Sequence, residues 1–101
     1  MAQVSMELSK LWRNNVRVIL RCMDITQENL AKACGVSRSG ISTMLNREDY
    51  RLTGIQFLGT MHALKYMIED KRIHYFDLSR ATVADKKWCE LNVYYLEHGL
   101  T

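Results

Sequence analysis

Hydrophobic residues recur every three or four positions through most of this chain, which is the spacing of helices that bury one face. In the first such stretch, which predicts a helix over residues 5–23, the apolar positions are Leu8, Leu11, Trp12, Val16, Ile19, Leu20 and Met23. Another face of the same helix carries a basic stripe made of Lys10, Arg13, Arg17 and Arg21. A solvated face is the default interpretation of this stripe, and a contact with phosphates or with an acidic partner is the alternative.

Residues 26–46 predict two short helices joined by a tight turn. Thr26 and Ser37 are residue types preferred at helix N-caps, and Gly35 between them tolerates the left-handed backbone that ends a helix. The expected buried positions are Leu30, Ala31 and Cys34 in the first helix and Ile41, Met44 and Leu45 in the second, with Val36 filling the corner. The polar run over 46–51 then predicts a loop.

Two longer helices are expected in the second half of the chain. Thr53 is the predicted N-cap of a helix that ends near Asp70 and whose inner face consists of Ile55, Leu58, Met61, Ala63 (or His62), Leu64, Met67 and Ile68. Residues 72–79 fit a short strand or a loop equally well. A last helix is predicted over 83–98, with Gly99 as its C-cap. The predicted fold class is all-α, a compact bundle of five helices.

The 26–46 segment meets the steric demands of a helix-turn-helix: Ala31 is small where the helices touch, Gly35 allows the turn, and Ile41 anchors the second helix. It resembles the helix-turn-helix family of phage repressors and Cro proteins, the xenobiotic-response-element type of bacterial regulator. The resemblance rests on residues 26–31 (TQENLA), 35–37 (GVS) and 41–42 (IS), and it runs from about Val16 to Lys65. It implies a lambda repressor-like bundle of four or five helices that binds DNA as a dimer.

We therefore expect residues 1–70 to form a DNA-binding domain, and residues 71–101 to be a C-terminal extension of it that is helical from about 83. The outward residues of the second short helix are small, polar and basic, which suits a helix that enters the major groove. Arg38 can span the O6 and N7 atoms of a guanine. The predicted base-contacting residues are Arg38, Ser39, Ser42 and Thr43, of which Ser42 is also placed for a phosphate.

Phosphate contacts are expected around both short helices. The resemblance implies one at Gln27, where the helix dipole and free N–H groups favour an anion. Asn46, Arg47 and Arg51 follow the second helix, and Ser37 lies at its start. Contacts of this kind fix the register of a protein on DNA without specifying sequence.

A homodimer that reads a palindrome is expected, because a few base contacts from one helix discriminate weakly. The last predicted helix has more apolar faces than packing on one side requires, and Tyr and Trp are enriched at interfaces. We expect this helix, with Tyr75 and Phe76 nearby, to form the dimer contact through Trp88, Leu91, Tyr94 and Tyr95. The alternative is that these residues cover the core of the monomer.

Composition adds little that is specific. The 101 residues suit a single domain, and the net charge of +3 is a mild excess. Cys22, Cys34 and Cys89 are expected to be small buried residues in a reducing compartment. The histidines are scattered, and no catalytic motif and no glycine-rich phosphate loop is present, so we expect no enzyme, cofactor or metal site. The absence of a long apolar run or a signal peptide predicts a cytoplasmic protein without membrane contact, associated with the nucleoid when DNA-bound.

The predicted function is that of a sequence-specific transcriptional regulator, a repressor of a phage or other mobile element. One alternative is an antitoxin whose carboxy-terminal third binds a protein toxin while its front half regulates its own operon. Another is a protein-interaction module that has lost DNA binding. The predicted partners are double-stranded DNA, a second copy of the chain and, in addition, a protein such as a toxin or an antirepressor.

Overall fold

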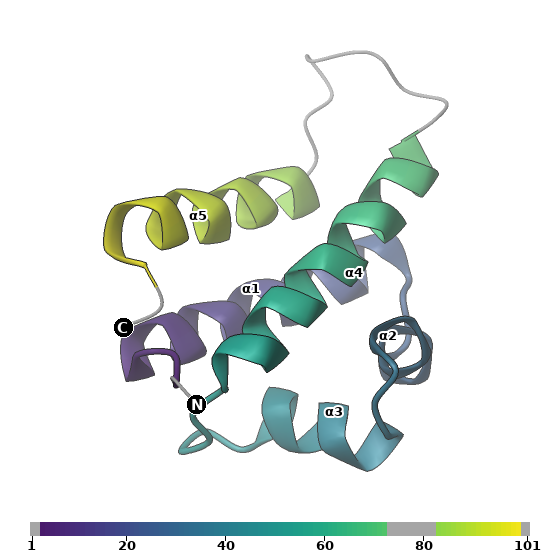
Figure 1. Cartoon of the computed structure of the whole chain (residues 1–101). Helices are drawn as coiled ribbons and strands as arrows, with labels where there is room; N and C mark the ends of the chain where they lie inside the picture. The colour runs from purple at the N-terminus through teal and green to yellow at the C-terminus, as the bar shows by residue number, and fades with distance from the viewer. Residues whose placement is uncertain (1–2, 73–82, 100–101) are drawn as a thin grey trace.

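Capping residues divide the chain into five helices, as the computed structural model shows for the backbone of residues 3–72 and 83–99 and the side chains of 3–68 and 83–99. The helices are α1 (Met6–Met23), α2 (Gln27–Cys34), α3 (Arg38–Asn46), α4 (Gly54–Arg72) and α5 (Val83–His98) (Figure 1). Within these described ranges there is no strand, only an isolated bridge between Gln3 and Thr53. The all-α prediction is confirmed, whereas the choice between strand and loop falls on residues 73–79, outside the described part.

Local hydrogen bonds set the helix ends where the sequence predicts them. The Thr26 and Ser37 hydroxyl oxygens each accept an N–H bond from the first turn of their helix, from Asn29 and Gly40 respectively, both at 3.0 Å. Gly35 adopts the left-handed conformation with φ of 69°. At the start of α4, Thr53 and Gln56 form a reciprocal pair in which each side chain accepts the other's backbone N–H, at 3.1 and 3.0 Å. This capping box satisfies two backbone donors at once.

A left-handed residue that is not glycine ends α1. Asp24 has φ of 55°, a region that costs an ordinary residue energy because its Cβ crowds the following carbonyl. The turn is closed by Ile25, whose N–H donates to the Leu20 carbonyl at 2.9 Å. Ile25 and Leu20 are both buried in the core, the hydrophobic contact that accompanies this kind of helix stop.

α1 lies in the middle of the molecule, with α5 packed along one side and the α2–α3 pair on the other (Figure 1). Its buried residues include the predicted inner-face positions Leu8, Trp12, Val16, Ile19 and Leu20. Ala84 and Leu91 of α5 belong to the same hydrophobic core as α1 to α4. The five helices therefore share one core, and the molecule is compact, with a radius of gyration of 13.2 Å.

The inner face of α4 differs from the predicted one at its N-terminal half. Ile55 and Leu58 were expected inside but are exposed, Ile55 to 64%, and Phe57 is buried in their place. The reason is a buried hydrogen bond at 3.0 Å from the Trp12 indole N–H to the Thr60 hydroxyl oxygen. This bond turns a polar position of α4 toward the core. Further along, Met61, Ala63, Leu64 and Ile68 are buried as predicted, whereas Met67 is half-buried and His62 is exposed.

Two other expectations about burial are wrong. Cys22 and Cys89 are exposed, and only Cys34 is half-buried, where burial raises the pKa of its thiol. Val36 does not fill the corner between α2 and α3, because its side chain is 42% exposed. Its backbone closes the turn instead, with the Val36 N–H donating to the Ala31 carbonyl at 3.0 Å.

Candidate nucleic-acid interface

α2 and α3 form a pair of short helices joined by the three residues 35–37. Ala31 is almost wholly buried at the contact between them, and Ile41 anchors α3 in the core with Met44 and Leu45. The small residue, the left-handed glycine and the aliphatic anchor thus occupy the positions that the sequence assigns to them. The opposite side of α3 faces outward.

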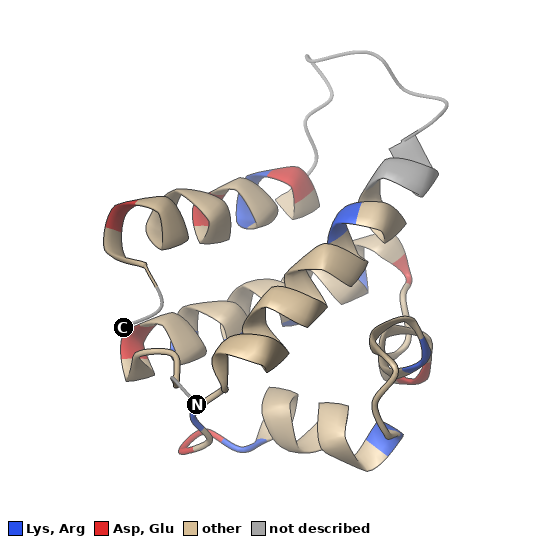
Figure 2. Ribbon diagram, viewed as in Figure 1, with Lys and Arg blue, Asp and Glu red and all other residues tan. Residues whose placement is uncertain are grey.

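That outward side is polar and carries no acidic residue. Figure 2 shows a basic residue at the start of α3 and more in the loop that follows it. Arg38 and Ser39 are exposed, and Ser42 and Thr43 are half-buried. The Arg38 side chain forms no hydrogen bond or ion pair with any part of the chain that the structure describes. Its guanidinium is therefore available to an external acceptor.

The hydroxyl groups of α3 are already partly engaged. The Thr43 hydroxyl donates to the Ser39 carbonyl at 3.0 Å. The Thr43 methyl group takes no part in this bond. The Ser37 hydroxyl, which caps the helix, also lies 3.2 Å from the Ser39 hydroxyl. Ser42 accepts a bond at 3.0 Å from the side-chain amide of Asn46. These bonds fix the orientation of the polar face before any ligand arrives.

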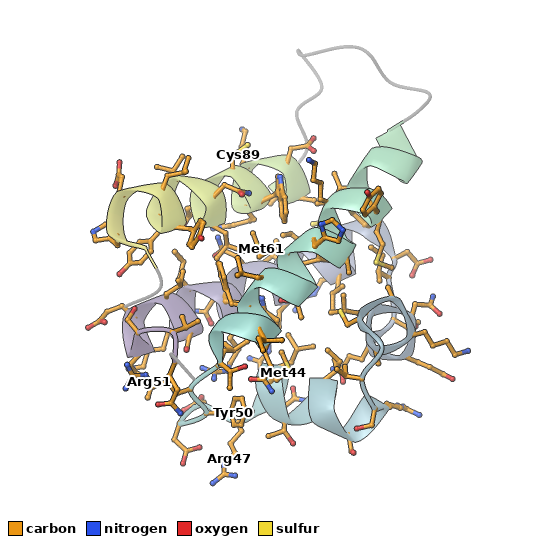
Figure 3. All side chains as sticks on the ribbon, in the orientation of Figure 1. Met44, Arg47, Tyr50, Arg51, Met61 and Cys89 are labelled. Atoms are coloured by element: carbon orange, nitrogen blue, oxygen red, sulfur yellow. The ribbon has the colours of Figure 1, made fainter. Side chains whose placement is uncertain are left out.

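The residues predicted to contact phosphate lie around the two short helices, but they differ in how free they are. Gln27 is half-buried in the first turn of α2. Asn46 is exposed, and its side-chain oxygen accepts a bond at 3.2 Å from Arg17 of α1. Arg47 is paired with Asp49 at 3.0 Å, and Arg51 donates through Nε to the Val4 carbonyl. In Figure 3 the Arg47 side chain points away from the body of the protein.

Arg13, which the sequence places in a basic stripe, is buried with 3% exposure. Its guanidinium donates to three backbone carbonyls, those of Met44 at 3.3 Å, Glu48 at 3.2 Å and Tyr50 at 2.8 Å. Met44 lies in the last turn of α3, where helix carbonyls lack partners within the helix. A buried cation there satisfies them and offsets the negative end of the helix dipole.

The charge of Arg13 is shaped by its surroundings. Burial, followed by the nearby charge of Arg17, lowers the pKa of Arg13, whereas Glu48 and Asp49 act in the opposite direction. The sequence offered one signal for its burial: Arg13 follows Trp12 and lies one helical turn before Val16, so it borders the apolar face. Arg13 is thus a positioning residue for α3 rather than part of a solvated stripe.

No protein-family model, curated protein or solved structure matches this chain. The resemblance to phage repressors and Cro proteins therefore stays a prediction that rests on the residues alone. Among the described residues, no helix is long and apolar enough to cross a membrane. The same part of the chain contains no group of three or more potential metal ligands.

The predicted dimer residues of α5 separate into two kinds. Leu91 is wholly buried in the core of the monomer, so its assignment to a dimer surface is wrong. It faces inward because α5 packs along α1. Trp88, Tyr94 and Tyr95 are half-buried against the same core, and Tyr75 and Phe76 lie outside the described residues. The apolar residues of α5 that face solvent are Val83, Val93 and Leu96.

Proposed function

We propose that this protein is a sequence-specific DNA-binding regulator of transcription, with α2 and α3 as a helix-turn-helix and α3 as its recognition helix. The observation that carries the proposal is the division of α3 into a buried apolar side and a polar outer side that begins with an arginine, Arg38, unpaired within the described residues. A recognition helix of this kind reads base edges mainly through its N-terminal residues. We propose no catalytic role.

In this proposal Arg38 forms a bidentate contact with a guanine, since the arginine fork matches its O6 and N7 acceptors. Ser39 lies beside it with an exposed hydroxyl. The Thr43 hydroxyl is held by the Ser39 carbonyl, so Thr43 offers its methyl group, which suits contact with the methyl group of thymine. Ser42 and Asn46 contact the edge of the groove, and Gln27, Ser37, Arg47 and Arg51 contact the phosphates.

We further propose that the protein binds a palindromic operator as a homodimer. One recognition helix offers few base contacts, and two helices about 34 Å apart double that number. The contact is proposed on the outer face of α5, where Val93 and Leu96 are exposed, flanked by the partly buried Trp88, Tyr94 and Tyr95. A dimer bound over a promoter would exclude RNA polymerase, so repression is the proposed outcome.

Selection of bound sites from random duplex DNA tests the proposal directly. We expect an enriched palindrome, and Arg38→Ala should weaken its binding by roughly 1–3 kcal/mol for each half-site, with loss of preference at one base pair in each. Arg47→Ala is the matched control, because loss of a phosphate contact weakens all sequences alike. Absence of both enrichment and duplex binding in dilute buffer would refute the function. Equal losses on every sequence for Arg38→Ala would remove Arg38 from the base-reading residues.

A second candidate function, that of an antitoxin, is favoured by the apolar surface of α5. Leu96 is 81% exposed, and large exposed hydrophobic side chains that cluster on one face suit a protein partner. In this alternative α5 binds a toxin and α3 regulates the operon. Co-purification with the product of the neighbouring gene, lost in Leu96→Glu, would favour it over the simple repressor.

A further inference from the structure

A shallow cleft of about 220 Å³ opens on the side of α1. None of its lining residues belongs to α3. Its lining consists of Lys10, Arg13, Asn14, Arg17 and Glu48. Four of these residues lie on α1 at the spacing of one helix face, and Glu48 comes from the loop after α3. The lining contains no aromatic or aliphatic residue, so the cleft suits a small, strongly polar ligand.

The charge of the lining favours an anion. Three cations face one carboxylate, and no ion pair joins Glu48 to Lys10, Arg13 or Arg17. Lys10 has no hydrogen bond or ion pair with any described residue. A guanidinium has five N–H donors, and Arg13 uses three of them on carbonyls, so two have no bond to the described part of the chain.

The position of the cleft connects it to α3. Arg17 donates at 3.2 Å to the side chain of Asn46, the last residue of α3, and Asn46 in turn donates to Ser42. Arg13 holds the Met44 carbonyl in the same turn of α3. An anion in the cleft would therefore lie beside the C-terminal end of α3, where the duplex backbone flanks a helix inserted into the major groove.

From this geometry we infer that the α1 cleft binds a phosphate of the DNA backbone, giving the protein an anchor that is separate from the base-reading face. The inference rests on the proposed function and adds a contact that neither α2 nor the residues after α3 supply. Lys10 provides a mobile point charge, and Arg17 and Arg13 provide planar N–H donors that match phosphate oxygens. The anchor is independent of sequence, because a phosphate carries no base information.

Binding to a random-sequence duplex of about 20 base pairs, followed by fluorescence anisotropy over a series of salt concentrations, tests the inference. Each phosphate that a protein neutralises contributes about 0.9 to the slope of log K against log salt, which is about eightfold in affinity at 0.1 M salt. We expect Lys10→Gln and the double variant Lys10→Gln/Arg17→Gln to lower the slope by about 1, and the affinity about eightfold, for each protomer bound.

The matched control for the double variant is Lys65→Gln/Lys86→Gln. It also removes two positive charges, from exposed positions on α4 and α5. α5 lies across α1 from α3, so Lys86 is remote from the proposed duplex (Figure 1). We expect this control to bind with the slope of the unaltered protein. Because Arg17→Gln also removes the bond to Asn46, thermal unfolding of each variant and its relative affinity for the selected operator and random DNA should be compared; both should stay unchanged for Lys10→Gln.

Each result leads to a different conclusion. If the unaltered protein binds no duplex, the proposed function fails and the inference fails with it. If it binds duplex but the cleft variants match the control double variant in slope and affinity, the cleft is not a DNA contact and the proposed function survives. The alternative ligand of the cleft is a free phosphate ion. Titration with inorganic phosphate, followed by NMR shifts of the α1 amides, tests this alternative. Saturable shifts of the α1 amides, with no effect of the cleft variants on duplex binding, would mean that the cleft binds free phosphate and would overturn the inference.

Discussion

α3 and α5 both pack against α1, from opposite sides, yet the surfaces that they expose differ in chemistry (Figure 1). α3 exposes Arg38 and Ser39, whereas α5 exposes Val93 and Leu96 together with Cys89, whose side chain points away from the body in Figure 3. A hydrated polyanion is recognised by the first kind of surface and an apolar protein surface by the second. One central helix thus supports two faces suited to different partners.

The largest effect that tests this comparison is expected within α5 itself. Leu91→Ala should lower the free energy of unfolding by about 3 kcal/mol, because it opens a cavity in the core. Leu96→Glu should change stability by no more than about 0.5 kcal/mol, because Leu96 is exposed, but it should convert a homodimer to a monomer. Urea unfolding and sedimentation velocity give the two readouts. Comparable loss of stability in both variants would mean that α5 has no separate outer face.

On the α3 side, Arg13→Leu should lower the free energy of unfolding by about 2 kcal/mol, since carbonyls at the end of α3 lose a charged donor. Duplex affinity should fall as well, because α3, the proposed recognition helix, is no longer held at its C-terminal end. Arg13→Lys is the control: it keeps the charge, but an ammonium lacks the planar fork that reaches three carbonyls. Urea unfolding and anisotropy measure the effects, and full stability in Arg13→Leu would contradict the positioning role.

The smallest expected effect comes from a variant at the end of α1 that stabilises the fold without changing the outer surface of α3 or of α5. Asp24→Gly should raise the free energy of unfolding by about 1 kcal/mol, because glycine adopts the left-handed backbone without strain. Removal of a negative charge at the negative end of the α1 dipole acts in the same direction. Thermal unfolding would show the gain, and duplex affinity and sedimentation should not change. A lower melting temperature would indicate that the Asp24 side chain stabilises the turn.

Helix bounds were predictable because their determinants are local. Thr26, Ser37 and Gly99 act on backbone groups within four residues, and the predicted last helix over 83–98 agrees with α5. The orientation of α4 was not predictable, because it depends on a bond between Trp12 and Thr60, far apart in the sequence.

The candidate site shows the same division. The polar side of α3 follows from the spacing of its apolar residues, so Arg38 could be identified from sequence. The role of Arg13 in holding α3 could not be identified, because its acceptors are backbone carbonyls 31 to 37 positions further along the chain. Every residue has a backbone carbonyl, so the sequence does not show which carbonyls accept a bond from Arg13. Contact of the basic stripe of α1 with phosphates was one alternative from the sequence, but the cleft itself was not predictable, because Glu48 meets α1 only in the folded chain.

That Arg13 bonds to main-chain oxygens has an evolutionary consequence. Every residue type carries the same carbonyl, so mutations at positions 44, 48 and 50 can change side chains without removing the acceptors that Arg13 holds. The outward residues of α3 are not needed for this attachment either. In the proposed function, new operator preferences can therefore arise by substitution on α3 while the bonds from Arg13 are inherited unchanged.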